Sequence, residues 1–156
     1  MRGFAAATVL GLCFAAAADA GERPEFLGSP DPAAAKLPFS EAVRSGDLLF
    51  LSGQIGTVPG AGNALAKGGI AAEAEQTLSN IRAVLERHGA SMRDVVKCTV
   101  FLADIGDWPA FNEVYRKHFS APFPARSALA ASGLALGAKI EVECIAQAPR
   151  KAGKAR

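Results

Sequence analysis

The segment IAAEAEQTLSNIRAVLERHG (70–89) sets the strongest constraint on the fold of this chain. Five of its side chains recur at spacings of four, three, four and three residues, which places them on one face of an α-helix. Gly89 follows the last of them and is a typical helix stop. The pattern predicts a helix over 70–88 with one face that must pack on another layer. The residues of this face are Ala74, Leu78, Ile81, Leu85 and His88.

Strand patterns and a second helix pattern surround this helix. DWPAFNEVYRKHF predicts a helix over 107–119, with Asp107 as its cap and Pro109 in its first turn. Runs of β-branched and other apolar residues predict strands elsewhere, the first two as a hairpin. The order β-β-α-β-α-β-β predicts an α+β fold with both helices on one face of a sheet. The predicted strands are 42–45, 48–54, 95–104, 126–131 and 139–148.

The predicted strands differ in how polar their two faces are. In 139–148, alternate residues from Ile140 are apolar, while the opposite face carries Glu141 and Glu143. The strands 95–104 and 48–54 are instead apolar on both sides. A monomer with two layers would expose that second side, and large exposed apolar patches mark interfaces. We therefore predict a homo-oligomer built on the sheet face opposite the helices, with Glu141 near it.

The two ends of the 156-residue chain differ from its middle. Residues 1–20 have a positive start, an apolar run and an Ala-Asp-Ala end, which is typical of a secretory signal. The run is too short and too rich in alanine to favour the alternative, an uncleaved anchor. We expect an exported protein, periplasmic or secreted, that has no membrane attachment after cleavage. The remaining segments are an extended lead-in (21–40), one folded domain (41–149) and a basic, disordered tail (150–156).

The formal net charge is +2, and the positive excess lies in the tail. Removing residues 1–20 takes away one arginine and one aspartate and leaves the charge at +2. Arg150, Lys151, Lys154 and Arg156 supply four of the positive charges, so the rest carries 2 − 4 = −2. A domain with this negative net charge lacks the excess of positive charge that nucleic-acid binding requires, so we expect no nucleic-acid partner.

Cysteine and histidine are sparse. Cys98 and Cys144 each lie within an apolar strand pattern. An exported compartment permits a disulfide, while a buried free thiol is the ordinary alternative, and the sequence leaves both open. His88 and His118 fall on different helices, so no metal site is predicted.

An arginine stands before an apolar run in FPARSALAASGLAL (123–136). At this position Arg126 is either a solvated turn residue or a group held there to bind an anion. Its planar guanidinium binds a carboxylate through two parallel hydrogen bonds. A partly buried glutamate such as Glu141 positions and activates water. Without a motif for an activated serine or cysteine, the pair fits hydrolysis of a substrate that is already electrophilic.

These residues lie in five motifs with a shared resemblance: LLFLSGQIG, EQTLSNIRAVLERHGASMRDVVKCTVFLAD, FNEVYRKHF, FPARSAL and KIEVECIA. Their order and spacing over 43–148 resemble the RidA (YjgF) family of enamine/imine deaminases. The resemblance implies a chorismate-mutase-like mixed sheet with two helices on one face, and a homotrimer with sites between subunits. It also implies hydrolysis of 2-iminopropanoate and 2-iminobutanoate to 2-keto acids and ammonia, without a metal or organic cofactor.

The resemblance also assigns roles to individual residues. Arg126, from FPARS, would bind the substrate carboxylate, and Glu141, from IEVE, would hold the attacking water. Ser52, from SGQ, and Asn112, before the tyrosine of the second helix, would line or brace the pocket. The ordinary alternatives are a turn-end hydroxyl for Ser52 and a helix-surface residue for Asn112.

Two substrate-binding positions depart from the family pattern. Ala128 stands where many members have a cysteine, and Phe39 stands where many have a tyrosine. The cysteine acts largely through its backbone in the family, whereas Phe39 lacks a hydroxyl that would orient water or substrate. The departures keep a non-catalytic carboxylate-binding module open as an alternative. Ribonuclease and chaperone-like activities, also attributed to the family, are further alternatives.

Overall fold

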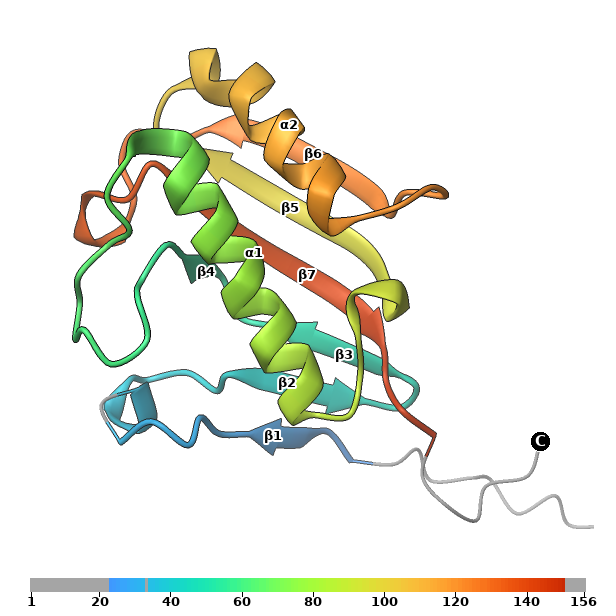
Figure 1. The fold of residues 1–156 in the computed structure, drawn as a ribbon. Helices are drawn as coiled ribbons and strands as arrows, with labels where there is room; N and C mark the ends of the chain where they lie inside the picture. Colours follow the sequence, from blue (N-terminus) through green and yellow to red (C-terminus); the bar gives the residue numbers. More distant parts are fainter. Residues whose placement is uncertain (1–22, 33, 151–156) are drawn as a thin grey trace, which may run out of the picture.

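The computed structural model describes residues 23–32 and 34–150. They form two layers: a seven-stranded sheet and two helices that lie side by side on one of its faces (Figure 1). The predicted α+β fold is thereby confirmed. The predicted signal segment and residues 151–156 of the tail lie outside the described residues. None of the helices in the described part is long and apolar enough to span a bilayer.

The elements follow the predicted order, with short additions. The helices are α1 (Gly69–Arg87) and α2 (Trp108–His118). The strands are β1 (Glu25–Leu27), β2 (Ala42–Ser45), β3 (Leu48–Leu51), β4 (Gln54–Ile55), β5 (Val95–Leu102), β6 (Ala125–Ala130) and β7 (Ile140–Gln147). Single 3₁₀ turns are η1 (Ala34–Lys36), η2 (Met92–Asp94), η3 (Ile105–Asp107) and η4 (Ala135–Gly137).

The sheet runs in the order β1-β2-β3-β7-β5-β6, and β4 also pairs with β7. All pairs are antiparallel except β5 and β6, which are parallel and connected through α2. The last strand in sequence, β7, therefore lies at the centre of the sheet, and β6 lies at one edge. This topology places Glu141 on a central strand and Arg126 on an edge strand.

The predicted face of α1 is the face that packs on the sheet. Ala74, Leu78, Ile81 and Leu85 are fully buried in the core, and His88 is half-buried at the C-terminal cap. Gly89 ends the helix with a φ of 76°, a conformation that favours glycine. The periodicity therefore predicted both the packed face and the end of this helix correctly.

Two predicted segments differ from the observed ones. The lead-in 21–40 contains β1, which pairs with β2 through Phe26 and Val43, so the sheet begins before residue 41. The predicted strand 48–54 is broken into β3 and β4 at Ser52 and Gly53. Along β7, Ile145 pairs with Phe50 and Val142 pairs with Gln54. The chain therefore advances by four residues from β3 to β4 while β7 advances by three. One extra residue is thus accommodated as an irregularity in the ladder.

The start of the second helix also differs in detail. Asp107 occupies the capping position of α2, as predicted, but its side chain makes no capping hydrogen bond. Instead Asp104 caps the preceding turn η3, where its side chain accepts a hydrogen bond from the backbone N–H of Gly106. The helix α2 itself begins at Trp108, one residue after the predicted start, and the 3₁₀ turn η3 leads directly into it.

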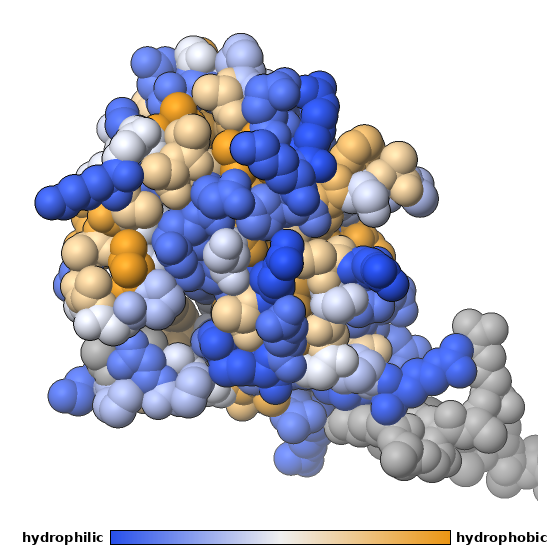
Figure 2. All heavy atoms as spheres, viewed as in Figure 1, coloured by the Kyte–Doolittle hydropathy of each residue, from blue (hydrophilic) through white to orange (hydrophobic). Residues whose placement is uncertain are grey.

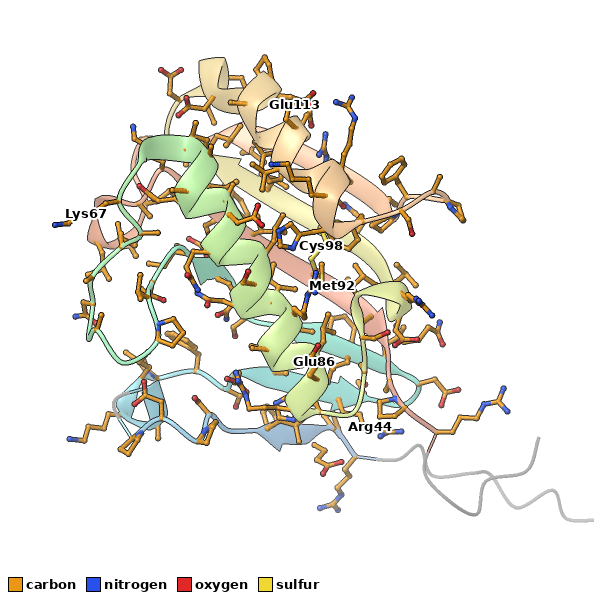
Figure 3. All side chains as sticks on the ribbon, viewed as in Figure 1. Arg44, Lys67, Glu86, Met92, Cys98 and Glu113 are labelled. Carbon is orange, nitrogen blue, oxygen red and sulfur yellow. A yellow bond between two sulfur atoms is a disulfide. The ribbon has the colours of Figure 1, made fainter. Side chains whose placement is uncertain are left out.

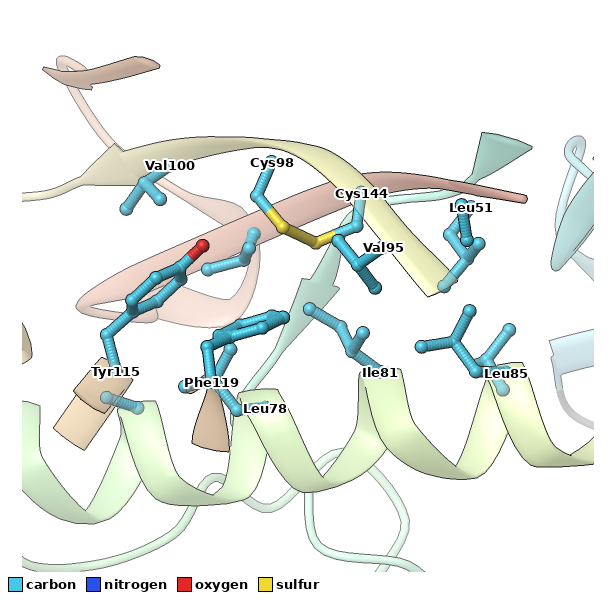
Figure 4. Close-up of a cluster of buried hydrophobic side chains, with 14 of the residues drawn as sticks. Leu51, Leu78, Ile81, Leu85, Val95, Cys98, Val100, Tyr115, Phe119 and Cys144 are labelled. Atoms are coloured by element: carbon cyan, nitrogen blue, oxygen red, sulfur yellow. A yellow bond between two sulfur atoms is a disulfide. The ribbon is translucent and has the colours of Figure 1, made fainter. Parts of the chain in front are cut away.

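A disulfide joins Cys98 and Cys144, which lie directly opposite each other on β5 and β7. Both cysteines face the helices and are 0% and 2% exposed. Figure 3 labels Cys98 between the two helices, and Figure 4 shows both cysteines among core side chains such as Ile81. Of the two alternatives that the sequence left open, the free thiols are therefore wrong for this structure.

The sheet face away from the helices carries exposed apolar side chains, together with Glu141 and Glu143, in the described part of the chain. Phe26, Phe50 and Leu129 are 73%, 40% and 46% exposed. The opposite side of the molecule differs, since hydrophilic residues gather over the outer surfaces of the helices (Figure 2). The predicted exposure of the second sheet face is thus confirmed for the single chain.

Candidate active site

Arg126 lies on the helix side of the sheet, near the start of the edge strand β6. It pairs with the buried Cys98, and paired residues of parallel strands point to the same face. Its guanidinium carbon lies 5.7, 5.4 and 4.7 Å from the ring centres of Trp108, Phe111 and Tyr115. Aromatic faces at these distances attract a cation and restrict its movement. The guanidinium is therefore held against α2.

Asn112 fixes the same guanidinium by a hydrogen bond. Nη2 of Arg126 donates to Oδ1 of Asn112 at 2.7 Å. Asn112 and the three aromatic residues recur at helical spacings, so one face of α2 presents all four groups. Within residues 23–32 and 34–150, Asn112 is the one hydrogen-bond partner of this side chain. The remaining N–H groups of the fork are left for an anion.

A hollow of about 310 Å³ lies beside this arginine, between α2 and the segment that leads into β6. Its volume is in the range of small-molecule sites. A larger hollow of about 600 Å³, lined by Arg82, His118 and Phe119, contains none of the predicted site residues. We therefore assign the site to the smaller hollow. Its lining residues are Asn112, Tyr115, Arg116, Phe123, Pro124 and Arg126.

Glu141 lies on β7 and points away from the helices. Its neighbours Ile140 and Val142 are fully buried on the helix side, while Glu141 is only half-buried. A methyl group added at Gly53 would overlap with Oε1 of Glu141, so the carboxylate packs directly against that glycine. Burial raises the pKa of the Glu141 carboxyl above its ordinary value, and the nearby negative charge of Glu143 adds to this rise.

Ser52 and Phe39 lie on the segments next to this carboxylate. The Ser52 hydroxyl donates a hydrogen bond to the backbone carbonyl of Ser40 at 2.6 Å. The backbone N–H of Ser52 donates to the carbonyl of Glu41 at 3.0 Å. Ser52 thus braces the segment that carries Phe39, whose ring is largely exposed.

Ala128 points to the same side of the sheet as Arg126, two residues earlier on β6, but it does not line the hollow. It pairs with Val100 on β5 and packs against the hydrophobic core beneath the helices. A cysteine side chain at this position would point into the core as well. Any contribution of residue 128 to a binding site therefore comes from its backbone, which an alanine also provides.

The described chain brings the predicted site residues together in two separate groups. Arg126 and Asn112 form one group on the helix side of the sheet, at its edge. Glu141 and Ser52 belong to the other, around the break between β3 and β4. Arg126 and Glu141 do not meet, because they lie on opposite faces of the sheet. The first group thus contains the predicted carboxylate-binding residue, and the second contains the predicted water-positioning residue.

Sequence reasoning missed two features of these groups. The aromatic residues of α2 lie on the apolar side of its sequence pattern, and only the fold shows that Trp108 and Tyr115 also contact Arg126. Their helical spacing from Asn112 was the available signal. Gly53 was present in the SGQ motif, and a glycine within a strand pattern often marks a close approach of another group.

The chain belongs to the family described as Endoribonuclease L-PSP, whose model matches residues 29–148. The predicted RidA relationship is confirmed by relatives in other organisms. This chain is 40% identical over 124 residues to Reactive Intermediate Deaminase A, chloroplastic, of Arabidopsis thaliana. The match covers 80% of this chain and 66% of the relative. The chain is 43% identical over 109 residues to 2-iminobutanoate/2-iminopropanoate deaminase of Homo sapiens, covering 70% and 79%.

Solved structures show the same fold. RidA from the Antarctic bacterium Psychrobacter sp. PAMC 21119 is 39% identical, with a TM-score of 0.69 over 73% of this chain and 91% of that one. A putative endoribonuclease L-PSP from Entamoeba histolytica is 38% identical, with a TM-score of 0.73 over 80% and 99%. The arrangement of one sheet and two helices is therefore that of the family.

Proposed function

We propose that this protein hydrolyses reactive 2-imino acids, and their enamine tautomers, to 2-keto acids and ammonia. The proposed substrates are 2-iminopropanoate and 2-iminobutanoate. The observation that carries the proposal is the guanidinium of Arg126, held by three aromatic rings and Asn112 at a hollow of small-molecule size. Relatives with the names reported above support the same reaction.

Arg126 has the role of binding the substrate carboxylate. The N–H groups that Asn112 does not use form a fork that matches the two oxygens of a carboxylate. The aromatic rings stabilise the cation before substrate binds, so little ordering of this side chain is left to the binding step. In this position the imine carbon lies next to the clamped carboxylate.

Glu141 has the role of positioning water. Its ionised carboxylate accepts a hydrogen bond from the water and directs the oxygen to the imine carbon. The water oxygen becomes the keto oxygen, the C=N bond breaks, and the nitrogen leaves as ammonia with both protons of the water. The substrate is already electrophilic, so the step needs orientation more than a strong nucleophile.

A homotrimer would join the two groups of site residues. In a cyclic, head-to-tail assembly one surface of each subunit meets a different surface of the next. The Arg126 group of one subunit can then face the Glu141 group of its neighbour, and no residue needs to cross the sheet. The exposed apolar sheet face, with Phe26, Phe50 and Leu129, supplies the area that such an interface would bury.

The remaining predicted residues have supporting roles. Asn112 orients Arg126, and Ser52 braces the chain beside Glu141. Phe39 offers an apolar wall where a tyrosine would offer a hydroxyl, and Ala128 contributes only its backbone.

We also propose that the protein acts outside the cytoplasm, in the periplasm or as a secreted protein. The disulfide between Cys98 and Cys144 supports this location, because structural disulfides persist in oxidising compartments. The signal-like sequence of residues 1–20 supports it independently.

The test of the proposed reaction uses imines formed in situ. An amino-acid oxidase generates 2-iminopropanoate or 2-iminobutanoate, and semicarbazide traps whatever imine remains. We expect the purified protein to suppress semicarbazone formation and the Arg126→Ala variant, checked for unchanged oligomeric state, to have no effect. Equal suppression by the variant would contradict the role of Arg126. Keto-acid binding without suppression would instead favour the non-catalytic binding module.

A further inference from the structure

A second arginine lines the hollow beside Arg126. Arg116 lies on α2 one helical turn after Asn112, so both side chains leave the same face of that helix. Among the described residues that line this hollow, two are arginines and none is acidic. A single guanidinium is enough to bind the one carboxylate of 2-iminopropanoate. The second positive charge therefore exceeds what a monocarboxylate requires.

The present partner of Arg116 holds it only weakly. Arg116 forms an ion pair with Glu113, three residues earlier on α2. The two side chains are 61% and 72% exposed, and exposed pairs of this kind contribute little because water and salt screen them. Glu113 itself is not one of the lining residues. Arg116 can therefore exchange this partner for an anion in the hollow.

The position of Arg116 differs from that of the other basic residues at the end of α2. Arg116, Lys117 and His118 all occupy the last turn, where positive charge suits the helix dipole. The favourable interaction with the helix dipole is the same for all three residues, whichever way their side chains point. Lys117 is exposed and does not line the hollow, whereas Arg116 does. Lys117 thus provides a matched control for charge on the same turn.

Both arginines line one small hollow, which suits a short molecule with two negative ends. Asn112 touches Arg126, and the four residues from Asn112 to Arg116 rise by about 6 Å along the helix. Phe123 and Pro124 supply an apolar part of the lining of the same hollow. Two guanidinium groups in one small hollow repel each other, and a dianion offsets this repulsion better than a monoanion.

We propose that the preferred substrates of this site are 2-imino acids with a second carboxylate, on a chain of four or five carbons. Arg126 binds the carboxylate next to the imine, and Arg116 binds the distal one. This inference rests on the proposed imine hydrolysis. For 2-iminosuccinate, water adds to the imine carbon, the C=N bond breaks, and the products are oxaloacetate and ammonia in equal amounts.

The experiment compares two imines in the semicarbazide assay. An aspartate-specific oxidase generates 2-iminosuccinate, and an alanine-active oxidase generates 2-iminopropanoate. The measured quantity is the ratio of kcat/KM for the dicarboxylate to kcat/KM for the monocarboxylate. We expect Arg116→Ala to lower this ratio about fivefold, as an exposed ion pair allows. Arg116→Glu should lower it further, and Lys117→Ala should leave it at the wild-type value.

A second variant moves the ratio in the opposite direction. Glu113→Gln removes the competing carboxylate from Arg116 and leaves the cation in place. We expect this variant to raise the ratio. A structural role for the pair would instead lower both rates together, so the sign of the change separates the two explanations. A ratio that Arg116→Ala and Arg116→Glu leave at the wild-type value would overturn the inference.

Binding measurements separate failure of this inference from failure of the proposed reaction. If the wild type hydrolyses neither imine, the proposed reaction fails, and titration calorimetry with oxaloacetate and pyruvate tests the charge arrangement alone. Weaker oxaloacetate binding by Arg116→Ala, with a smaller change for pyruvate, supports the second carboxylate site. An equal change for both keto acids, or none, overturns it.

Discussion

Arg126 and Glu141 lie on opposite faces of one sheet, separated by the strand β5. Arg126 packs under the rings of α2, whereas Glu141 points to the sheet face opposite α1 and α2. Both residues are nonetheless the best candidates for binding and for water activation. A site that uses both therefore takes them from different subunits. This relationship makes the oligomer part of the proposed mechanism and not only a source of stability.

Gly53 controls the position of the Glu141 carboxylate. A side chain at residue 53 would occupy the space that Oε1 of Glu141 now fills. We expect Gly53→Ala to displace the carboxylate and lower kcat about tenfold, since misplaced catalytic groups lose their orientation. Steady-state kinetics with 2-iminopropanoate measure this effect. Gly28→Ala is the matched control, because a methyl group there meets nothing within 4 Å; an equal loss in both variants would contradict the prediction.

The charge of Glu143 affects the pH dependence of activity. Burial raises the pKa of Glu141, and Glu143 raises it further. Activity that needs the ionised carboxylate falls as pH drops through this raised pKa. We expect Glu143→Gln to lower the pKa of Glu141 and so move the acidic limb of kcat/KM to lower pH. Glu86→Gln, on the helix side of the molecule, should leave the limb in place. A limb that does not move in Glu143→Gln would count against Glu141 as the group that titrates.

Tyr115 supports Arg126 through its ring. Its hydroxyl is buried without a hydrogen-bond partner in the described part of the chain, and burial raises its pKa to about 12, an effect that Arg126 partly offsets. We expect Tyr115→Phe to keep the melting temperature or raise it, because an unpaired buried hydroxyl is destabilising. Tyr115→Leu should raise KM about fivefold, since it removes the ring face from the cation.

Phe119→Leu is the control for the packing that Tyr115→Leu also removes. The Phe119 ring lies 4.4 Å from that of Tyr115 and is buried, but it makes no cation–π contact with Arg126 in the described structure. It should lower stability without raising KM. A similar rise of KM in both variants would show that packing alone explains the effect of Tyr115→Leu.

The disulfide should contribute to stability. Cys98 and Cys144 are 46 residues apart in sequence, and closing a loop of this size stabilises a folded chain by about 2–4 kcal/mol. We expect a reductant to lower the free energy of unfolding of the wild type by this amount, measured in urea at fixed protein concentration. The Cys98→Ala/Cys144→Ala double variant should not respond to reductant. An equal response of the two proteins would mean that the reductant acts elsewhere.

The sequence predicted the layers because their signals are local. The spacing of Leu78, Ile81 and Leu85 is set within one helix, and alternation along 139–148 is set within one strand. The strand β1 was missed because three residues, Glu25–Leu27, are too few for a pattern to emerge. Its position depends on pairing with β2, which is a property of the folded sheet.

The arrangement of the site depended on contacts between distant segments. The pairing of Cys98 with Cys144 follows from the register of β5 and β7, which neither strand specifies alone. The separation of Arg126 from Glu141 likewise follows from the sheet order and from which face each strand turns to the helices. Residue types and motifs indicated the candidate side chains, whereas the topology determined which of these candidates meet.

The most direct test of the shared site mixes two inactive variants. Arg126→Ala lacks the carboxylate clamp, and Glu141→Gln lacks the water-positioning carboxylate. In randomly mixed rings from equal amounts of both chains, about one site in four combines an intact Arg126 with an intact Glu141 from a neighbouring subunit. We expect co-refolded variants to regain about a quarter of wild-type imine hydrolysis, while each variant refolded alone stays inactive. Mixed oligomers with no more activity than the separate variants would contradict it.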